Sequence, residues 1–172
     1  RNAPRVENLV AIRGEISQLV ERMLAHGASS TQITHIITLL NDHTVCRVIE
    51  LSIADKGDPG VPFSWLCFGS EGRREQTLHT DQDNGILFDA RDAAHAAEIR
   101  GLLLPLAQQI NQSLALCGFT LCKGNIMAGN PELCLSRAEW ARRFAAMIRE
   151  ATPENLLKSS IYFDLRVVWG DE

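Results

Sequence analysis

The sequence predicts an α/β (α+β) fold in which a small mixed sheet lies between an N-terminal helical hairpin and C-terminal helices. Three observations lead to this class. Apolar residues recur every three or four positions through the first part of the chain, two short apolar runs in the middle have the length of buried strands, and helix-capping patterns return towards the C-terminus. The 172 residues suffice for one medium domain with a helical attachment.

Two helices are expected at the N-terminus. The first covers residues 6–26 and ends at Gly27, and a Ser-Ser-Thr run then caps the second. The turn-rich segment 55–60 (Asp-Lys-Gly-Asp-Pro-Gly) is the clearest boundary in the chain. We therefore divide the chain into an N-terminal helical segment (1–58), a core (59–135) and C-terminal helices (136–172) that look like a truncated helical domain.

The core is expected to contain short strands and one long helix. Residues 62–68 form an apolar, aromatic-rich run, and residues 84–88 form a second one, so both are predicted to be buried strands. Residues 93–116 predict a long helix kinked at Pro105. Residues 119–127 predict a third, weaker strand.

Two further helices are predicted after the core. Ser136 and Glu139 have the spacing of a capping box, and the helix that they begin carries Trp140. Thr152 followed by proline is typical of a helix start. The helix expected there includes Leu156, Leu157, Ile161, Leu165 and Val168.

The composition limits the class of function. The formal net charge of −4 argues against broad electrostatic binding to nucleic acid. The chain has no run of about 18 apolar residues, so no membrane span is expected. The chain has five cysteines, an odd number, and none of them forms a CxxC pair. Cys117 and Cys122 lack the closely spaced His or Cys pair that a zinc site would need. Buried free thiols and a cytoplasmic location are therefore expected.

Asp81 and Asp83 are the first candidate site residues. Two positions apart on an extended segment, they point to the same face, roughly 6.6 Å apart along the chain. Carboxylates in this arrangement can share hard cations, as two-metal phosphoryl chemistry requires. The alternative is a solvated loop with two ordinary surface aspartates.

Gly69 and Ser70 form the second candidate feature, about ten residues before the acids. They follow a predicted strand and begin a short helix, so Gly69 allows a close backbone approach and the amides at the helix start can donate to phosphate. Ser70 adds a hydroxyl, and Arg73 can reach the same anion with its planar guanidinium group. The alternative is a simple tight turn.

The two features together resemble a known family. Gly-Ser followed by Asp-x-Asp on the next strand is the hallmark of nucleotidyltransferases with the DNA polymerase beta-type fold. The string Gly69-Ser-Glu-Gly-Arg-Arg-Glu-Gln-Thr-Leu-His-Thr-Asp-Gln-Asp-Asn84 looks closest to a nucleotidyltransferase family that follows CBS and cyclic-nucleotide-binding domains in bacterial signalling proteins. That family is similar in turn to the PII-protein uridylyltransferase. Later segments that fit are 122–127, the Trp140 helix, 160–166 and 170–171.

The resemblance implies roles for individual residues. The implied phosphate ligands are Gly69, Ser70, Arg73 and Arg74; the implied ligands of Mg²⁺ (or Mn²⁺) are Asp81 and Asp83; and the implied supporting residues are Glu75, Thr80, Gln82 and Asn84. The wider fold also supplies a third carboxylate from an adjacent strand as general base, but residues 119–127 contain no acid. Asp164 is a possible substitute, with a salt bridge to Arg166 or Lys158 as its competing use.

The predicted function is Mg²⁺-dependent transfer of a nucleoside monophosphate from a nucleoside triphosphate to a hydroxyl group, with release of pyrophosphate. The acceptor is expected to be a protein or a small molecule, and regulatory CBS or cyclic-nucleotide domains are expected as partners. One alternative is a nucleotide-sensing module that binds without transfer. Another is a DxD glycosyltransferase, which the Gly69-Ser70 pair disfavours.

Overall fold

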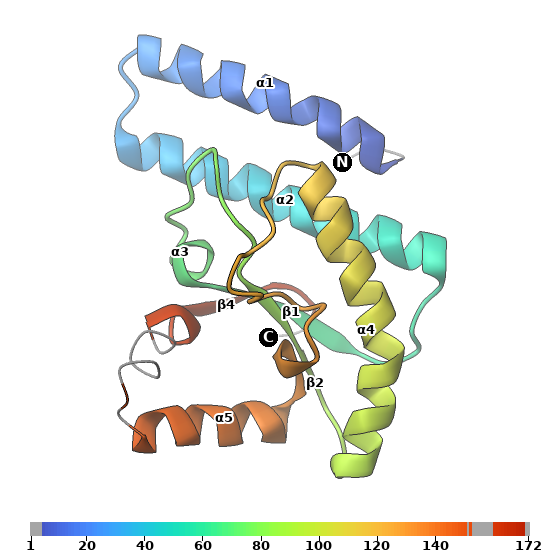
Figure 1. Cartoon of the computed structure of the whole chain (residues 1–172). Helices are drawn as coiled ribbons and strands as arrows, with labels where there is room; N and C mark the ends of the chain where they lie inside the picture. Colours follow the sequence, from blue (N-terminus) through green and yellow to red (C-terminus); the bar gives the residue numbers. More distant parts are fainter. Residues whose placement is uncertain (1–4, 151, 153–159, 171–172) are drawn as a thin grey trace.

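A four-stranded mixed sheet with helices on both faces forms the centre of the protein (Figure 1). The computed structural model describes residues 5–150, 152 and 160–170. The strands are β1 (Phe63–Phe68), β2 (Asn84–Phe88), β3 (Cys134–Ser136) and β4 (Leu165–Trp169), in the order β3-β2-β1-β4. β1 pairs antiparallel with β2 and β4, whereas β2 and β3 are parallel. The predicted α/β class and the mixed sheet are thus confirmed.

Successive side chains of β1 belong alternately to two separate apolar cores. Trp65 and Cys67 belong to the larger core, together with residues of α2 (Ser30–Lys56) and α4 (Ala93–Leu116). Leu66 and Phe68 belong to the second core, with Trp140 and Met147 of α5 (Arg137–Arg149). Because successive side chains of a strand point to opposite faces, β1 is buried on both sides. α2 and α4 therefore cover one face of the sheet and α5 covers the other (Figure 1).

The N-terminal hairpin forms as predicted. α1 (Val6–Ala25) and α2 lie side by side (Figure 1), and Ser29 caps α2 through a capping box with Gln32. The hairpin also contacts the loop before the acid pair, since the Arg13 guanidinium donates to the carbonyl of Leu78. α4 continues through Pro105, and the predicted capping box of Ser136 and Glu139 begins α5.

The predicted helical structure of Leu165 and Val168 is wrong. Residues 165–169 form β4, which pairs with β1 at the edge of the sheet opposite β3. Leu165 and Val168 are three positions apart, which fits one turn of a helix. The five-residue segment Leu-Arg-Val-Val-Trp is equally suited to a strand, and the free edge of β1 decides between the two structures. The helix predicted from Thr152-Pro153 through Leu157 lies outside the described residues apart from Thr152.

The third strand predicted at residues 119–127 is also wrong. This segment forms a single bridge, from Thr120 to Asp81, and then turns, with Asn125 in the left-handed region at φ 55° and its N–H donating to the Cys122 carbonyl. β3 takes the edge of β2 instead, in register with Ile86 to Phe88. The segment nevertheless lies beside the acids, which matters for the site.

Candidate functional site

A tight turn joins β1 to the short helix α3 (Gly69–Gly72). Gly69 is buried and has φ +56°, a conformation that side chains rarely adopt. A Cβ atom at this position would lie 3.7 Å from Oδ2 of Asp83. The turn and the second acid, fourteen positions apart, are therefore neighbours in space.

The acid segment runs directly into β2. The carbonyl of Asp83 accepts a 2.9 Å hydrogen bond from the N–H of Phe68, which extends the β1–β2 pairing to the edge of the Gly69 turn. Asp81 is exposed and Asp83 is half-buried. Burial raises the pKa of Asp83, and the charge of Asp81 adds to this effect, while a hydrogen bond from the Cys122 thiol opposes it.

Asp81, Asp83 and Cys122 are close enough to share an ion. One ligand atom from each lies within 4.8 Å of the others, and no other group of three such side chains is found in the described part of the chain. The Oδ1 atom of Asp83 is buried and has no hydrogen-bond partner. A buried carboxylate oxygen without a donor is costly unless a cation or a bound group completes it.

The residues between and after the acids point the other way, into a buried amide network. Gln82 donates to the carbonyls of Asn111 (3.0 Å) and Phe119 (3.1 Å), and Asn111 donates to Gln82 (2.8 Å) and Asn84 (3.0 Å). The N–H of Ala128 donates to the Asn84 side chain at 2.8 Å. These amides fasten the acid segment to α4 and to the loop beside it. Asn111 has no distinguishing motif in the sequence.

The predicted phosphate ligand Arg73 is engaged in ion pairs. Its Nε donates to Glu75 at 2.8 Å, and its NH1 group donates to Asp164 at 2.5 Å. Arg74 is exposed, with φ 61°, and its carbonyl accepts from the Thr38 hydroxyl. Asp164 does not pair with Arg166 and is not in the group of three around the acids. In the structure, the role of Asp164 that competes with catalysis is its ion pair with Arg73.

Ser70 and Thr80 complete the set of predicted residues. Ser70 follows Gly69 in α3 and is partly exposed, and its carbonyl accepts from the N–H of Glu75 at 2.8 Å. Thr80 is buried, and its carbonyl accepts from the N–H of Thr120 at 3.1 Å. Thr80 therefore helps to hold the segment that carries Cys122 beside the acids.

A partly buried ionic network next to α3 was not predicted from the sequence. Arg166 of β4 makes two 2.9 Å hydrogen bonds to the Asp42 carboxylate of α2, and also donates to the carbonyl of Glu71 at 3.1 Å. Glu71 itself is only 3% exposed. Burial raises the pKa of its carboxyl group to about 7, and the nearby Asp42 charge adds to this shift, whereas a hydrogen bond with Cys67 and the charge of Arg166 oppose it. The network anchors α3, and with it the Gly69 turn, to α2 and β4.

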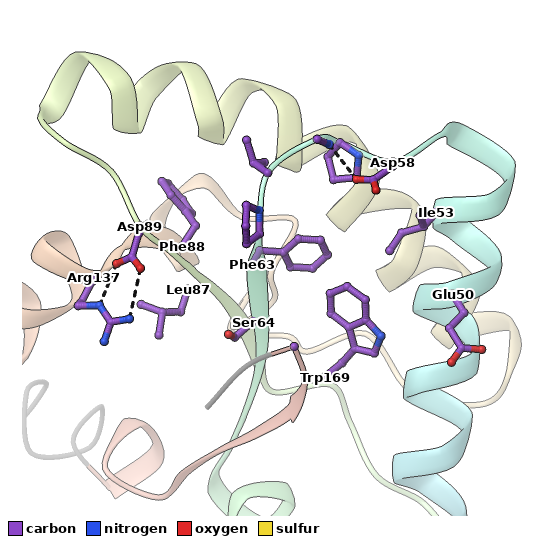
Figure 2. A pocket seen from close by; sticks show the side chains of 15 residues that line it. Glu50, Ile53, Asp58, Phe63, Ser64, Leu87, Phe88, Asp89, Arg137 and Trp169 are labelled. Atoms are coloured by element: carbon purple, nitrogen blue, oxygen red, sulfur yellow. Dashed lines mark hydrogen bonds and ion pairs between the residues drawn. The ribbon is translucent and has the colours of Figure 1, made fainter.

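A hollow in the structure lies away from the acids and the Gly69 turn. It has a volume of about 780 Å³ and is lined by residues such as Phe63, Ser64 and Trp169, with the Asp89–Arg137 ion pair at its edge (Figure 2). Phe63 begins β1 and Phe68 ends it, so the hollow and the Gly69 turn lie at opposite ends of this strand. None of the predicted site residues lines it.

Comparison with known protein families identifies the class of this protein. The family "Putative nucleotidyltransferase DUF294" matches residues 14–154. The chain belongs to this family, which agrees with the nucleotidyltransferase class predicted from the sequence. The matched span contains every predicted site residue except Asp164. No curated protein matches the chain.

Two general expectations can also be compared with the structure. All five cysteines are free thiols, three of them buried. Among the described helices, none has the length and apolar character needed to cross a bilayer.

Proposed function

We propose that this domain transfers a nucleoside monophosphate from a nucleoside triphosphate to a hydroxyl acceptor, in a reaction that depends on Mg²⁺ or Mn²⁺. One observation carries the proposal: the Gly69 turn lies against Asp83, so the turn that we expect to bind phosphate is next to the pair of carboxylates. A phosphate group bound at the start of α3 would be next to any cation held by the acids.

The residues present fit a hard divalent cation. Asp81 and Asp83 would hold it through carboxylate oxygens, the donors that Mg²⁺ and Mn²⁺ prefer, and the unpartnered Oδ1 of Asp83 is available for it. When bound, such an ion neutralises charge on the transferred phosphoryl group and its leaving oxygens. Gln82 and Asn84 position the acids from the opposite side of the segment.

The remaining residues bind and orient the triphosphate. Gly69 permits a close approach of the backbone, Ser70 offers a hydroxyl, and Arg73, with Arg74 next to it, offers positive charge. The acceptor oxygen forms a bond to the α-phosphorus while the bond to the β-phosphate oxygen breaks, so pyrophosphate leaves with the electron pair. The acceptor proton passes to a base, either Asp164 or solvent.

The acceptor and the cellular context are proposed from the sequence resemblance. Similarity to the PII-protein uridylyltransferase and to proteins with CBS or cyclic-nucleotide-binding domains favours a protein or small-molecule acceptor in a bacterial signalling pathway in the cytoplasm. The formal net charge of −4 makes a nucleic-acid acceptor the less favoured choice.

A second candidate function is nucleotide sensing without transfer. One observation favours it: among the described residues, the third side chain beside Asp81 and Asp83 is the thiol of Cys122 instead of a carboxylate. A site without a third carboxylate has lost the usual general base of the fold, whereas binding of the metal and the triphosphate needs only the first two acids.

Incubation with α-labelled nucleoside triphosphates separates the two functions. We expect label to become attached to the acceptor, with pyrophosphate released in equal amount, only when Mg²⁺ or Mn²⁺ is present. Asp81→Asn and Asp83→Asn should abolish both products. Metal-dependent stabilisation by a triphosphate without any pyrophosphate, across a broad set of protein and small-molecule acceptors, would support the sensor. Absence of any triphosphate binding would overturn both functions.

A further inference from the structure

The loop beside the acids carries a thiol that is held in place by the backbone. The N–H groups of Gln82 and Asn84 donate to carbonyls of this loop at 2.8 and 3.1 Å. Asp83 lies between these two anchors, and its carboxylate accepts a hydrogen bond from Cys122. The position of Cys122 is therefore fixed by pairing on both sides of the second acid.

The spacing of the three side chains suits a single ion. Their ligand atoms lie within 4.8 Å of one another. An ion about 2.3 Å from a thiolate and about 2.1 Å from a carboxylate oxygen needs these atoms at most about 4.4 Å apart. Only a small side-chain adjustment separates the present arrangement from a coordinated one. The buried Oδ1 of Asp83 has no hydrogen-bond partner, so this carboxylate retains an oxygen that can bind an ion.

The donor set differs from that of an all-oxygen magnesium site. Two carboxylates and a thiolate combine hard and soft ligands, and the thiolate favours ions such as Co²⁺ and Zn²⁺ over Mg²⁺. Among the described residues, Cys122 is the one cysteine that belongs to a group of three side chains close enough to share an ion.

We propose that Cys122 is the third ligand of the ion held by Asp81 and Asp83, and that this site binds Co²⁺ or Zn²⁺ more tightly than Mg²⁺. The proposal rests on the proposed function, because it uses the same acid pair. On binding, the sulfur lone pair forms the bond to the ion and the thiol proton leaves to solvent.

Titration of the whole chain with Co²⁺ in the absence of nucleotide tests the sulfur ligand directly. Thiolate bound to cobalt gives a charge-transfer absorption in the near ultraviolet. We expect this band in the unmodified protein and in Cys46→Ser, which removes the other half-buried thiol, but not in Cys122→Ser. Cobalt affinity of Cys122→Ser should fall at least about tenfold, whereas the thermal shift produced by Mg²⁺ should persist, since serine keeps an oxygen in place.

The outcomes distinguish this inference from the proposed function. A cobalt band that survives in Cys122→Ser overturns the role of Cys122. The role is equally overturned if the unmodified protein gives no band while Mg²⁺ still stabilises it and Asp83→Asn removes that stabilisation; the proposed function then stands. If neither ion binds with or without triphosphate, the proposed function fails as well.

Discussion

Gly69 and Asp83 lie so close that a methyl group added to Gly69 would be 3.7 Å from Oδ2 of Asp83. The hydrogen bond from the Phe68 N–H to the Asp83 carbonyl at 2.9 Å fixes this relationship through the backbone. One ligand can therefore contact both the turn and the carboxylate. Each of the two residues can be altered to test whether the turn and the acids act together.

Gly69→Ala should remove triphosphate binding at a modest cost in stability. The added methyl group occupies the space between the turn and Asp83, and alanine at φ +56° costs about 1–2 kcal/mol. We expect the thermal shift given by Mg²⁺ plus triphosphate to disappear. Gly101→Ala, in the exposed middle of α4 with no atom near the new methyl group, is the matched control and should be stabilising by about 0.5–1 kcal/mol. Full triphosphate binding by Gly69→Ala would refute the phosphate-binding turn.

Asp83→Asn should leave the metal-free protein as stable as before, or slightly more stable. The raised pKa of Asp83 means that its charged form is disfavoured by burial and by Asp81, and asparagine removes this charge while keeping an oxygen for the Cys122 thiol. The melting temperature without metal should stay the same or rise by about 1–3 °C. Stabilisation by Mg²⁺ plus triphosphate should vanish. Strong destabilisation without metal would instead make Asp83 a structural hydrogen-bond acceptor.

Asp164→Asn tests which of two roles this residue has. Its 2.5 Å ion pair with Arg73 competes with any phosphate for the same guanidinium. We therefore expect triphosphate affinity to rise roughly two- to threefold, the range expected for an exposed ion pair, with turnover intact. Asp89→Asn breaks a comparable exposed pair, with Arg137, and should change neither quantity. A loss of turnover with unchanged affinity would assign Asp164 the role of general base.

The local parts of the site could be predicted from the sequence because they depend on neighbouring residues. Strands β1 and β2 are short apolar runs, and the Gly-Ser turn and the two acids sit at the ends of those runs. Strand pairing then brings the ends together without further information. The same reasoning located the capping residues before α2 and the capping box that begins α5.

The parts of the fold and of the site that could not be predicted from the sequence depend on contacts between distant segments. Arg166 and Asp42 are 124 positions apart, and no local pattern links them. The five residues of β4 fit the apolar spacing of a helix as well as that of a strand. Only the pairing of this segment with β1 decides between the two structures. Along the chain, Cys122 has no cysteine or histidine at the spacing of a zinc site, so the sequence indicates no metal ligand there. Its neighbours in space, Asp81 and Asp83, are about forty positions away. The bridge between Asp81 and Thr120 brings the segment that carries this thiol beside the carboxylates.

Asn111 should be essential for the shape of the acid segment. Its side chain joins Gln82, Asn84 and the N–H of Gly129, all in buried or partly buried positions. Asn111→Leu leaves these partners unsatisfied and should lower the free energy of unfolding by about 2–4 kcal/mol. Gln112→Leu, exposed on the next position of α4, should change it by no more than about 0.5 kcal/mol. Urea denaturation of both variants measures the difference, and equal stabilities would contradict the network's role.

Glu71 should make the protein less stable as the pH rises from about 4.5 to about 7. Its pKa is 4.5 in an unperturbed carboxyl group and about 7 in the folded protein, where burial disfavours the charge. The folded state therefore binds the proton more tightly than the unfolded state, so stability from this group is complete below pH 4.5 and is lost as the pH rises through 7.

Glu71→Gln should remove that pH dependence, because the amide resembles the neutral acid. At pH 8 the variant should be more stable than the unmodified protein by up to about 3 kcal/mol, and at pH 4 the two should be nearly equal. Glu98→Gln, on the exposed side of α4, should follow the unmodified protein at every pH. Denaturation curves recorded between pH 4 and pH 8 measure these differences. If Glu71→Gln is instead the less stable protein at pH 8, the ionised carboxylate is stabilised by Arg166 by more than burial costs, and the network holds α3 through charge.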